Sequence, residues 1–272
     1  MSIQFAGGID IGGDIGGGGG GTTDHSALSN LAYENSGHTG FMSSDGFIPL
    51  NTVLTVKSDG SADFTSLQDA ISYLNNKWSN GVVCVDVYPE TYTINSTIIV
   101  GSQLNSIPKL VIRRMQGESG TFKIQNTASS AVLMVTGYQA DVTFNNMELE
   151  CTNATKPFAV FQIDTSSVVR TNNLSVKGAQ WGVFAGGVAS VLYPSISLTI
   201  DDCSVCGIEA QNASQILIGT IPVNISNVPL GVRVQRLSDI IFIASTVTFT
   251  NVTTQFSQTI NTQTASGMIY KD

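Results

Sequence analysis

The sequence predicts an all-β protein: a right-handed parallel β-helix with a short N-terminal capping helix and an extended N-terminal segment. The leading observation is a unit of roughly 24 residues that recurs five times between about residues 131 and 253 without a helical pattern. Val, Ile, Thr and Phe dominate these units and alternate with residues of different character, which is typical of strands. Such units stack as the coils of a solenoid, so their strands run in parallel. The right-handed winding follows from the crossover rule for parallel strands.

Two recurring features mark each predicted coil. The first is a small residue followed by a β-branched one, at Ala131-Val132, Ala159-Val160, Gly182-Val183, Gly207-Ile208 and Gly231-Val232. The second is a doublet that leads into another alternating segment, at Asn145-Asn146, Asn172-Asn173, Asp201-Asp202, Gly219-Thr220 and, more loosely, Ala244-Ser245. We interpret the doublets as equivalent bends, so that the Asp pair continues a ladder started by the two Asn pairs.

The chain divides into four predicted parts. They are a Gly-rich N-terminal tail at 1–21, a distinctive short segment at 22–50, the parallel β-helix at 51–254 and a C-terminal tail at 255–272. The Gly-rich tail is either a flexible linker or a segment that orders inside a partner assembly. The C-terminal tail either covers the last coil or packs along a neighbouring chain.

A capping helix is expected at about residues 66–76. Thr65 or Ser66 can cap it, and its apolar side chains then share one face: Leu67, Ala70, Ile71 and Leu74. A lid of this kind is needed because the first coil of a solenoid exposes unpaired strand edges and apolar side chains.

Composition excludes several classes of function. A net charge of −8 argues against nucleic acid as a partner, because phosphate binding requires clustered Lys and Arg. Mean hydropathy is positive at +0.17, but the longest apolar stretches are far shorter than the roughly 20 residues of a spanning helix, so no membrane insertion is expected. The N-terminus lacks the charged start and apolar run of a secretory signal. We therefore expect synthesis in the cytoplasm, with any release from the cell by another route such as lysis.

The four cysteines do not predict a metal or cofactor. Cys84 and Cys151 lie in apolar strand patterns and are expected to be small buried hydrophobes. Cys203 and Cys206 have metal-like spacing, but no second pair and no nearby His accompany them.

A short segment between Asp24 and Phe41 is the most distinctive part of the chain. Asp24 can cap a helical turn that brings Leu28 and Leu31 to one side, and a turn at 36–40 returns Phe41 to that side. So small an apolar face cannot fold alone. Another copy of the chain or another protein must therefore cover it.

This segment closely resembles one found near the N-terminus of many bacteriophage tail fibre, tail spike and baseplate-associated proteins. The matching residues are His25, Leu28, Asn30, Leu31, Tyr33, Ser36, Gly37, His38, Thr39, Gly40 and Phe41, with Ala32 where the family usually has Asp. The resemblance covers about a tenth of the chain. It implies a virion tail component, typically a homotrimer, in which residues 22–50 are the attachment and trimer-junction segment that joins it to other tail or baseplate proteins. His25 and His38 would then meet their copies on a threefold axis, either as hydrogen-bonded junction residues, which we favour, or as metal ligands.

A second resemblance concerns the start of the β-helix. A strand at 82–88, a helix before it and the turn Pro89-Glu90-Thr91-Tyr92 resemble the opening of pectin-lyase-like β-helix proteins, with Glu90 in place of the usual Gly. The resemblance implies that a pectin-lyase-like solenoid is the nearest type of β-helix. Many such proteins cleave or de-esterify polysaccharides, but a shared fold does not decide activity.

The sequence does not predict a catalytic site. Glycoside hydrolysis needs two carboxylates about 5 to 9.5 Å apart, and the tempting pair, Asp201 and Asp202, stands at a presumed bend position. The companion motifs of polygalacturonases are absent, and both His residues lie outside the β-helix. Asp164, Arg170 and Asp239 form no local set of the kind that lyases use.

We therefore expect a structural tail fibre or spike, with no enzymatic activity, whose β-helix adsorbs to the host surface through a glycan or another receptor. The alternatives are a tail spike depolymerase that cleaves host surface polysaccharide, and an architectural spacer without receptor contact. Trp181 and Tyr193 can stack on sugars if exposed, but aromatic residues in a solenoid more often fill the stack.

Overall fold

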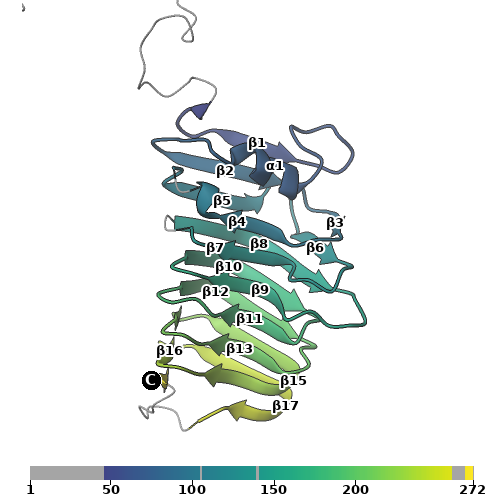
Figure 1. Cartoon of the computed structure of the whole chain (residues 1–272). Coiled ribbons are helices and arrows are strands. Elements are labelled where there is room, and N and C mark those ends of the chain that lie inside the picture. Colours follow the sequence, from purple (N-terminus) through teal and green to yellow (C-terminus); the bar gives the residue numbers. More distant parts are fainter. Residues whose placement is uncertain (1–45, 105, 139–140, 259–266, 272) are drawn as a thin grey trace, which may run out of the picture. The chain divides into compact units, whose positions relative to one another are not determined.

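The computed structural model describes residues 46–104, 106–138, 141–258 and 267–271. These residues form a parallel β-helix whose coils succeed one another from the N-terminal to the C-terminal end (Figure 1). The strands are β1 (Val53–Val56), β2 (Val82–Val87), β3 (Thr91–Ile94), β4 (Ile98–Gly101), β5 (Lys109–Arg114), β6 (Phe122–Asn126), β7 (Leu133–Thr136), β8 (Asp141–Cys151), β9 (Ala159–Asp164), β10 (Val168–Lys177), β11 (Trp181–Ala185), β12 (Val191–Asp201), β13 (Cys206–Ala210), β14 (Gln215–Ile218), β15 (Pro222–Val234), β16 (Ser238–Phe242), β17 (Thr246–Phe256) and β18 (Gly267–Lys271). The prediction of an all-β parallel β-helix with a short helix is confirmed.

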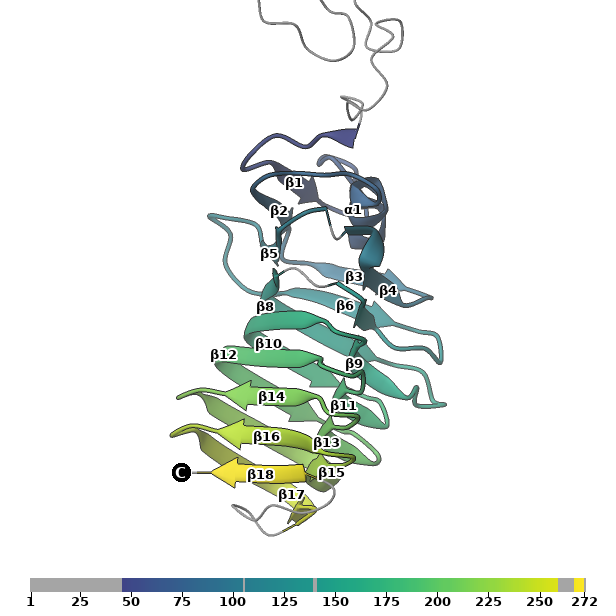
Figure 2. The ribbon, with the colours of Figure 1, turned by 60° about the vertical axis from the view of Figure 1, so that its left-hand side comes forward.

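The strands line three flanks. The first flank stacks β1, β2, β5, β14, β16 and β18 with the N-terminal halves of β8, β10 and β12. The second flank stacks β3 and β6 with the C-terminal halves of β8, β10 and β12 and the N-terminal halves of β15 and β17. The third flank stacks β4, β7, β9, β11, β13 and the ends of β15 and β17. Figure 2 shows β12, β14, β16 and β18 side by side on the first flank.

The predicted capping helix is present as α1 (Leu67–Leu74). Ser66 caps it, because the Ser66 hydroxyl accepts a hydrogen bond from the backbone N–H of Asp69 at 3.1 Å and donates one to the Asp69 carboxylate at 2.7 Å. The predicted apolar face is buried as expected, through Leu67, Ala70, Ile71 and Leu74. The helix packs against β1 and β4 and covers the first coil. Among the described residues no helix is long and apolar enough to cross a membrane.

The strand register corrects the predicted alignment of the doublets. Asn145 pairs with Asn172, and Asn172 pairs with Ser195. Asp201 instead pairs with Lys177, at the other end of the same strands. The Asp pair therefore does not continue the ladder of the Asn pairs, and our interpretation of the doublets as one equivalent bend was wrong at this coil.

Two different corners explain the error. Asn146 and Asn173 occupy the corner between the first and second flanks at φ of 57° and 58°, whereas Asp202, Asn227 and Asn251 occupy the next corner at φ of 52°, 54° and 54°. Asn and Asp adopt this left-handed backbone more readily than other residues with a side chain. Both corners select the same residue types, so similar doublets arise at positions that do not overlie one another.

A ladder of glycines marks the start of the third flank. Gly182, Gly207 and Gly231 overlie one another as predicted, whereas the pair that begins at Ala159 is one position out of line because Ala159 pairs with Trp181. A Cβ added at Gly182 would lie 2.8 Å from the carbonyl oxygen of Gly207, and one added at Gly207 would lie 2.7 Å from that of Gly231. At this corner each coil can approach the next so closely only because its residue there has no side chain.

The parallel stack extends beyond residue 254, where the sequence placed the start of a tail. β17 ends at Phe256, and β18 pairs with β16 in parallel over Gly267–Lys271. The inward-facing Ile269 of β18 is fully buried. Part of the predicted C-terminal tail therefore forms a further rung of the first flank.

We predict that Gly207→Ala destabilises the β-helix by about 1–3 kcal/mol, because the new methyl group would overlap the carbonyl of Gly231 in the adjacent coil. Gly219→Ala is the matched control, since a Cβ there meets nothing within 4 Å, and we expect a change within about 0.5 kcal/mol. Urea denaturation followed by circular dichroism measures both. Equal midpoints for the two variants would contradict the role of the glycine ladder.

Candidate functional site

The residues predicted for attachment and trimer contact lie outside the described part of the chain: His25, Leu28, Asn30, Leu31, Tyr33, Ser36, Gly37, His38, Thr39, Gly40 and Phe41. Their assignment stays a prediction. The candidate site that the structure does describe lies on the third flank of the β-helix.

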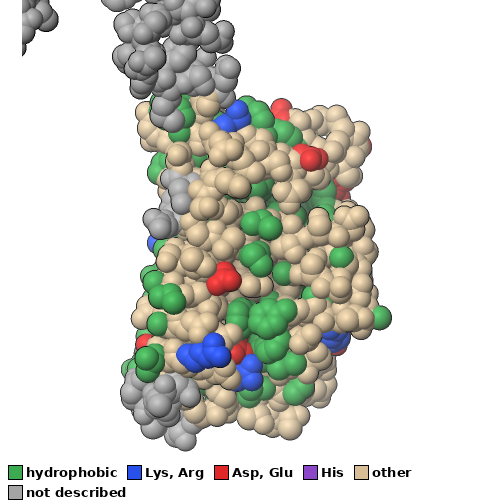
Figure 3. Space-filling model, in the orientation of Figure 1, with side chains coloured by type: hydrophobic (Ala, Val, Ile, Leu, Met, Phe, Trp, Pro, Cys, Tyr) green, Lys and Arg blue, Asp and Glu red, His purple; other side chains and the backbone are tan. Residues whose placement is uncertain are grey.

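Three aromatic side chains, Phe158, Trp181 and Phe184, form what we call the aromatic cluster. The ring centroids of Phe158 and Trp181 are 4.4 Å apart, those of Phe158 and Phe184 4.6 Å, and those of Trp181 and Phe184 6.2 Å. Phe158 is 41 % exposed, whereas Phe184 beneath it is 5 % exposed. In the space-filling view apolar side chains gather on the lower half of this face, with basic side chains beside them (Figure 3). The cluster is an apolar patch on the outside of the solenoid, where Phe158 is its most exposed ring.

Local sequence places the three rings together. Phe158 ends the connection from β8 to β9, and Trp181 begins β11 in the following coil. Phe184 points outward from β11, since Val183 and Ala185 on either side of it are buried in the interior. The ring of Phe184 lies over Gly186, where a Cβ would collide with it. The glycine therefore allows the ring to lie against the sheet.

A buried ion pair supports the cluster from the next two coils. The register places Phe184, Glu209 and Arg233 over one another in an outward-facing column. One carboxylate oxygen of Glu209 accepts hydrogen bonds from Arg233 Nε at 2.8 Å, from Arg233 Nη2 and from the indole Nε1 of Trp181. The Arg233 guanidinium also lies 5.7 Å from the centre of the Trp181 ring, within cation–π range. Glu209 is only 1 % exposed although it points outward, because these partners cover it.

The arrangement is suited to binding. Small-molecule sites combine aromatic side chains with a few fixed polar groups, and the cluster with the Glu209–Arg233 pair has both. The indole of Trp181 is held by a hydrogen bond on its nitrogen and by contacts with the rings of Phe158 and Phe184, so its orientation is set before any ligand arrives. Such preorganisation reduces the entropy lost on binding.

The acidic pair singled out in the sequence has structural partners. Asp201 accepts hydrogen bonds from Ser226 at 2.8 Å and Asn227 at 2.7 Å and pairs with Lys177 at 3.6 Å. Partial burial raises the pKa of the Asp201 carboxyl, but the hydrogen bonds from Asn227 and Ser226, together with the charge of Lys177, outweigh it and the net pKa is lowered. Asp201 therefore stays ionised and links adjacent coils.

The other acidic and basic candidates each interact with a different partner. Asp202 pairs with Lys156 at 2.8 Å. Arg170, on the first flank, binds Asp141 at 3.1 Å, whereas Asp164 belongs to β9 on the third flank. Asp239, three coils beyond Arg170 on the first flank, accepts a hydrogen bond from the backbone of Met268. The structure does not bring Asp164, Arg170 and Asp239 together.

The two closely spaced cysteines are buried thiols. Burial raises the pKa of Cys203 to about 12 and that of Cys206 further. Thiolates are the reactive and metal-binding form, so both side chains remain neutral near pH 7. Over the residues that the structure describes, no group of three or more His, Cys, Asp or Glu side chains is placed to hold a metal ion.

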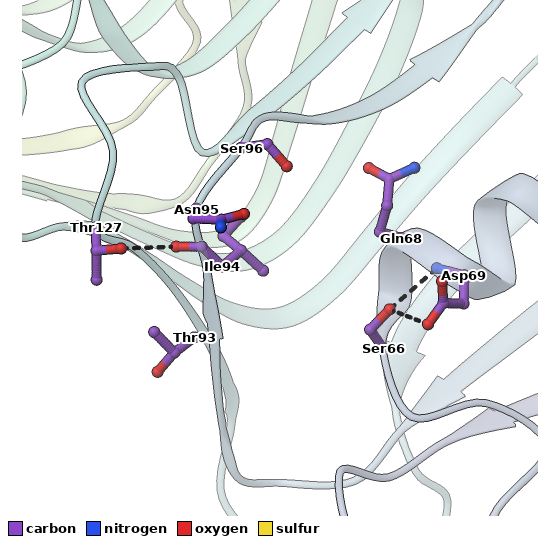
Figure 4. A pocket seen from close by; sticks show the side chains of 8 residues that line it. All are labelled: Ser66, Gln68, Asp69, Thr93, Ile94, Asn95, Ser96 and Thr127. Carbon is purple, nitrogen blue, oxygen red and sulfur yellow. Dashed lines mark hydrogen bonds between the residues drawn. The ribbon is translucent and has the colours of Figure 1, made fainter.

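A hollow of about 420 Å³ lies elsewhere on the molecule, between the start of α1 and the end of β3 (Figure 4). It is lined by Ser66, Gln68, Asp69, Thr93, Ile94, Asn95, Ser96 and Thr127. The carboxylate of Asp69 is already bonded to the capping Ser66, and Thr127 donates to the carbonyl of Ile94 at 3.2 Å. The hollow is polar and lacks an aromatic surface, so the aromatic cluster is the stronger candidate.

Sequence reasoning identified only part of this site. It named Trp181, either as a residue that stacks on sugars or, as is more common in a solenoid, as a filler of the stack, and it missed Phe158, Phe184, Glu209 and Arg233. One available signal was the spacing of Glu209 and Arg233, which are 24 residues apart in the chain, one coil in this part of the repeat. Comparison with protein-family models, with curated proteins and with solved structures gives no match for this chain.

We predict that Arg233→Met destabilises the protein by about 3 kcal/mol, because it leaves the buried carboxylate of Glu209 without its cation. Arg170→Met is the matched control: its side chain is 49 % exposed, and loss of an exposed pair costs about 1 kcal/mol or less. Adding Glu209→Gln to Arg233→Met should restore part of the loss, and a double-mutant cycle by urea denaturation measures the coupling. If both Arg variants lost the same free energy of unfolding, burial would not make the Glu209–Arg233 pair more costly to break than the exposed Asp141–Arg170 pair.

Proposed function

We propose that the protein is a structural virion component, a bacteriophage tail fibre or short tail spike, that assembles as a homotrimer. Residues 1–50 attach it to other tail or baseplate proteins, and the β-helix adsorbs to the host surface through a glycan. The observation that carries the adsorption function is the aromatic cluster on the outside of the β-helix. The resemblance of the N-terminal segment to tail proteins supports the virion assignment.

The aromatic cluster supports a sugar ligand on physical grounds. Pyranose rings present faces of C–H groups edged by hydroxyls, and such a face packs on an aromatic ring while the hydroxyls stay hydrated or bind polar groups. Phe158 and Trp181 offer an aromatic surface of this kind, backed by Phe184. A surface of preorganised rings beside fixed polar groups suits an extended ligand that binds and is released without chemistry.

An apolar column on the first flank supports packing between copies. Tyr193, Leu217, Ile241 and Tyr270 overlie one another on the outward face of β12, β14, β16 and β18. Tyr270 is 37 % exposed and the neighbouring Ile243 is 49 % exposed, whereas Tyr193, Leu217 and Ile241 are half-buried. Contiguous exposed apolar side chains mark interaction surfaces. Because this column runs along the stack of coils, side-by-side copies of the chain can bury it.

The trimer gives a direct prediction: the full-length protein should have a native mass three times 28.7 kDa. Ile241→Lys should lower that mass toward the monomer, because it places a charge in the apolar column. Thr248→Lys, an exposed position on the second flank, is the control and should leave the trimer intact. Analytical ultracentrifugation measures all three, and a stable monomer of the unmodified chain would refute this part of the proposal.

For adsorption, we predict that Phe158→Ala weakens binding to host cells about 2- to 10-fold. This is the change in affinity expected when one aromatic contact, of about 0.5–1.5 kcal/mol, is lost. Tyr73→Ala, which removes an exposed aromatic side chain from α1, should bind as the unmodified protein does. Fluorescently labelled trimer and intact bacteria provide the assay. Unchanged binding by the Phe158 variant would remove the cluster from the function, and a fall in the size of host polysaccharide would favour the depolymerase alternative.

A further inference from the structure

We propose that the aromatic cluster selects an uncharged polysaccharide, a neutral glycan rather than one bearing uronate, sialate or phosphate groups. The inference rests on the proposed adsorption function and specifies the class of its ligand. It follows from the way charge is distributed around the cluster.

The charged groups next to the cluster are neutralised within the protein. Arg233 is paired with Glu209, and Lys156, two residues before Phe158, is paired with Asp202 at 2.8 Å. Lys156 also donates a hydrogen bond to the backbone carbonyl of Asp202 at 2.7 Å. Each cation that borders the aromatic surface therefore already has a carboxylate.

Arg233 is poorly placed to bind an anionic ligand. Two of its nitrogens, Nε and Nη2, bind the carboxylate of Glu209, and its guanidinium lies over the Trp181 ring. A carboxylate or phosphate on a ligand would have to compete with Glu209. If Arg233 turned away, Glu209, which is 1 % exposed, would remain as an unpaired buried charge, and that is strongly unfavourable.

The remaining polar groups on this face suit hydroxyl groups. Gln162 overlies Phe184 on the preceding coil, and Gln211 and Gln235 come directly after β13 and β15, the strands that carry Glu209 and Arg233. An amide both donates and accepts hydrogen bonds, as a sugar hydroxyl does. Further along the same edge, Arg236 donates to the side chain of Asn212 at 3.1 Å, and Asp164 adds a negative charge. Arg236 and Asp164 have opposite formal charges, so together they add no net charge to this face.

The whole molecule also repels polyanions. The chain carries a net charge of −8 and has a pI of about 4.6. At physiological salt, charges act over about 8 Å, and like charges lower the local concentration of a ligand near the surface. An acidic polysaccharide would meet this repulsion at a cluster whose two bordering cations, Lys156 and Arg233, are already paired with carboxylates.

The test uses the full-length trimer with Trp78→Phe, so that Trp181 is the single tryptophan and its fluorescence reports on the cluster. The probes are envelope polysaccharides of a bacterium to which the protein adsorbs, separated by anion exchange into neutral and acidic fractions. We expect the neutral fraction to change Trp181 fluorescence, with an affinity that varies by less than about 2-fold between low and high salt. Adding Phe158→Ala should weaken that affinity about 2- to 10-fold.

Two results would overturn the inference while leaving the proposed function intact. One is binding of the acidic fraction alone, with affinity that falls as salt rises. The other is binding of the neutral fraction that Phe158→Ala does not weaken, which would place the glycan elsewhere on the molecule. A protein that adsorbs to no bacterium would instead defeat the proposed function itself, and this outcome appears before the fractions are compared.

Discussion

The parallel hydrogen bonding between successive coils is the constraint on which the rest of this structure depends. Each strand satisfies its backbone groups only if the next coil returns to the same place, so every coil must turn its corners at equivalent positions. Glycines permit this at one corner, where Gly207 lies against the carbonyl of Gly231. Left-handed Asn227 and Asn251 permit it at another, and the side-chain amide of Asn251 donates to that of Asn227 at 3.0 Å.

The same constraint builds the candidate site. Since coils are held in register, residues far apart in sequence become neighbours on the surface, and Phe184, Glu209 and Arg233 form one column for that reason. Coil length varies where the site lies. Leu133 pairs with Phe161, 28 residues later, and Phe161 pairs with Val183, 22 residues later. The longer coil contains the connection that carries Phe158, so a local departure from the repeat supplies the most exposed ring of the aromatic cluster.

Whether a feature of the fold or of the candidate site could be predicted from the sequence depends on how many residues carry its signal. The fold and α1 were predictable because alternation, period and the apolar face of the helix are repeated over many residues. The register was not, because Asp201 and Asn172 both stand near a bend and the coils differ in length, so a doublet cannot be assigned to one corner. Of the site, Trp181 was visible as an aromatic residue. The burial of Glu209 was not, since alternation gives the direction of a side chain and not what covers it.

The ion pairs of the β-helix differ in burial, and therefore in what they contribute to stability and to the geometry of the candidate site. Arg170 and Asp141 form an exposed pair, which adds little to stability. Burying a pair such as Glu209 and Arg233 is also a weak source of stability, because desolvation of both charges offsets their attraction. What the buried pair adds is geometry: the carboxylate of Glu209 is bonded to both the Trp181 indole and the Arg233 guanidinium, so the ring and the cation cannot move independently. An apolar pair of equal volume would fill this position but would leave the indole N–H without an acceptor. The orientation of the aromatic surface therefore depends on a charge pair that is closed to ligand anions.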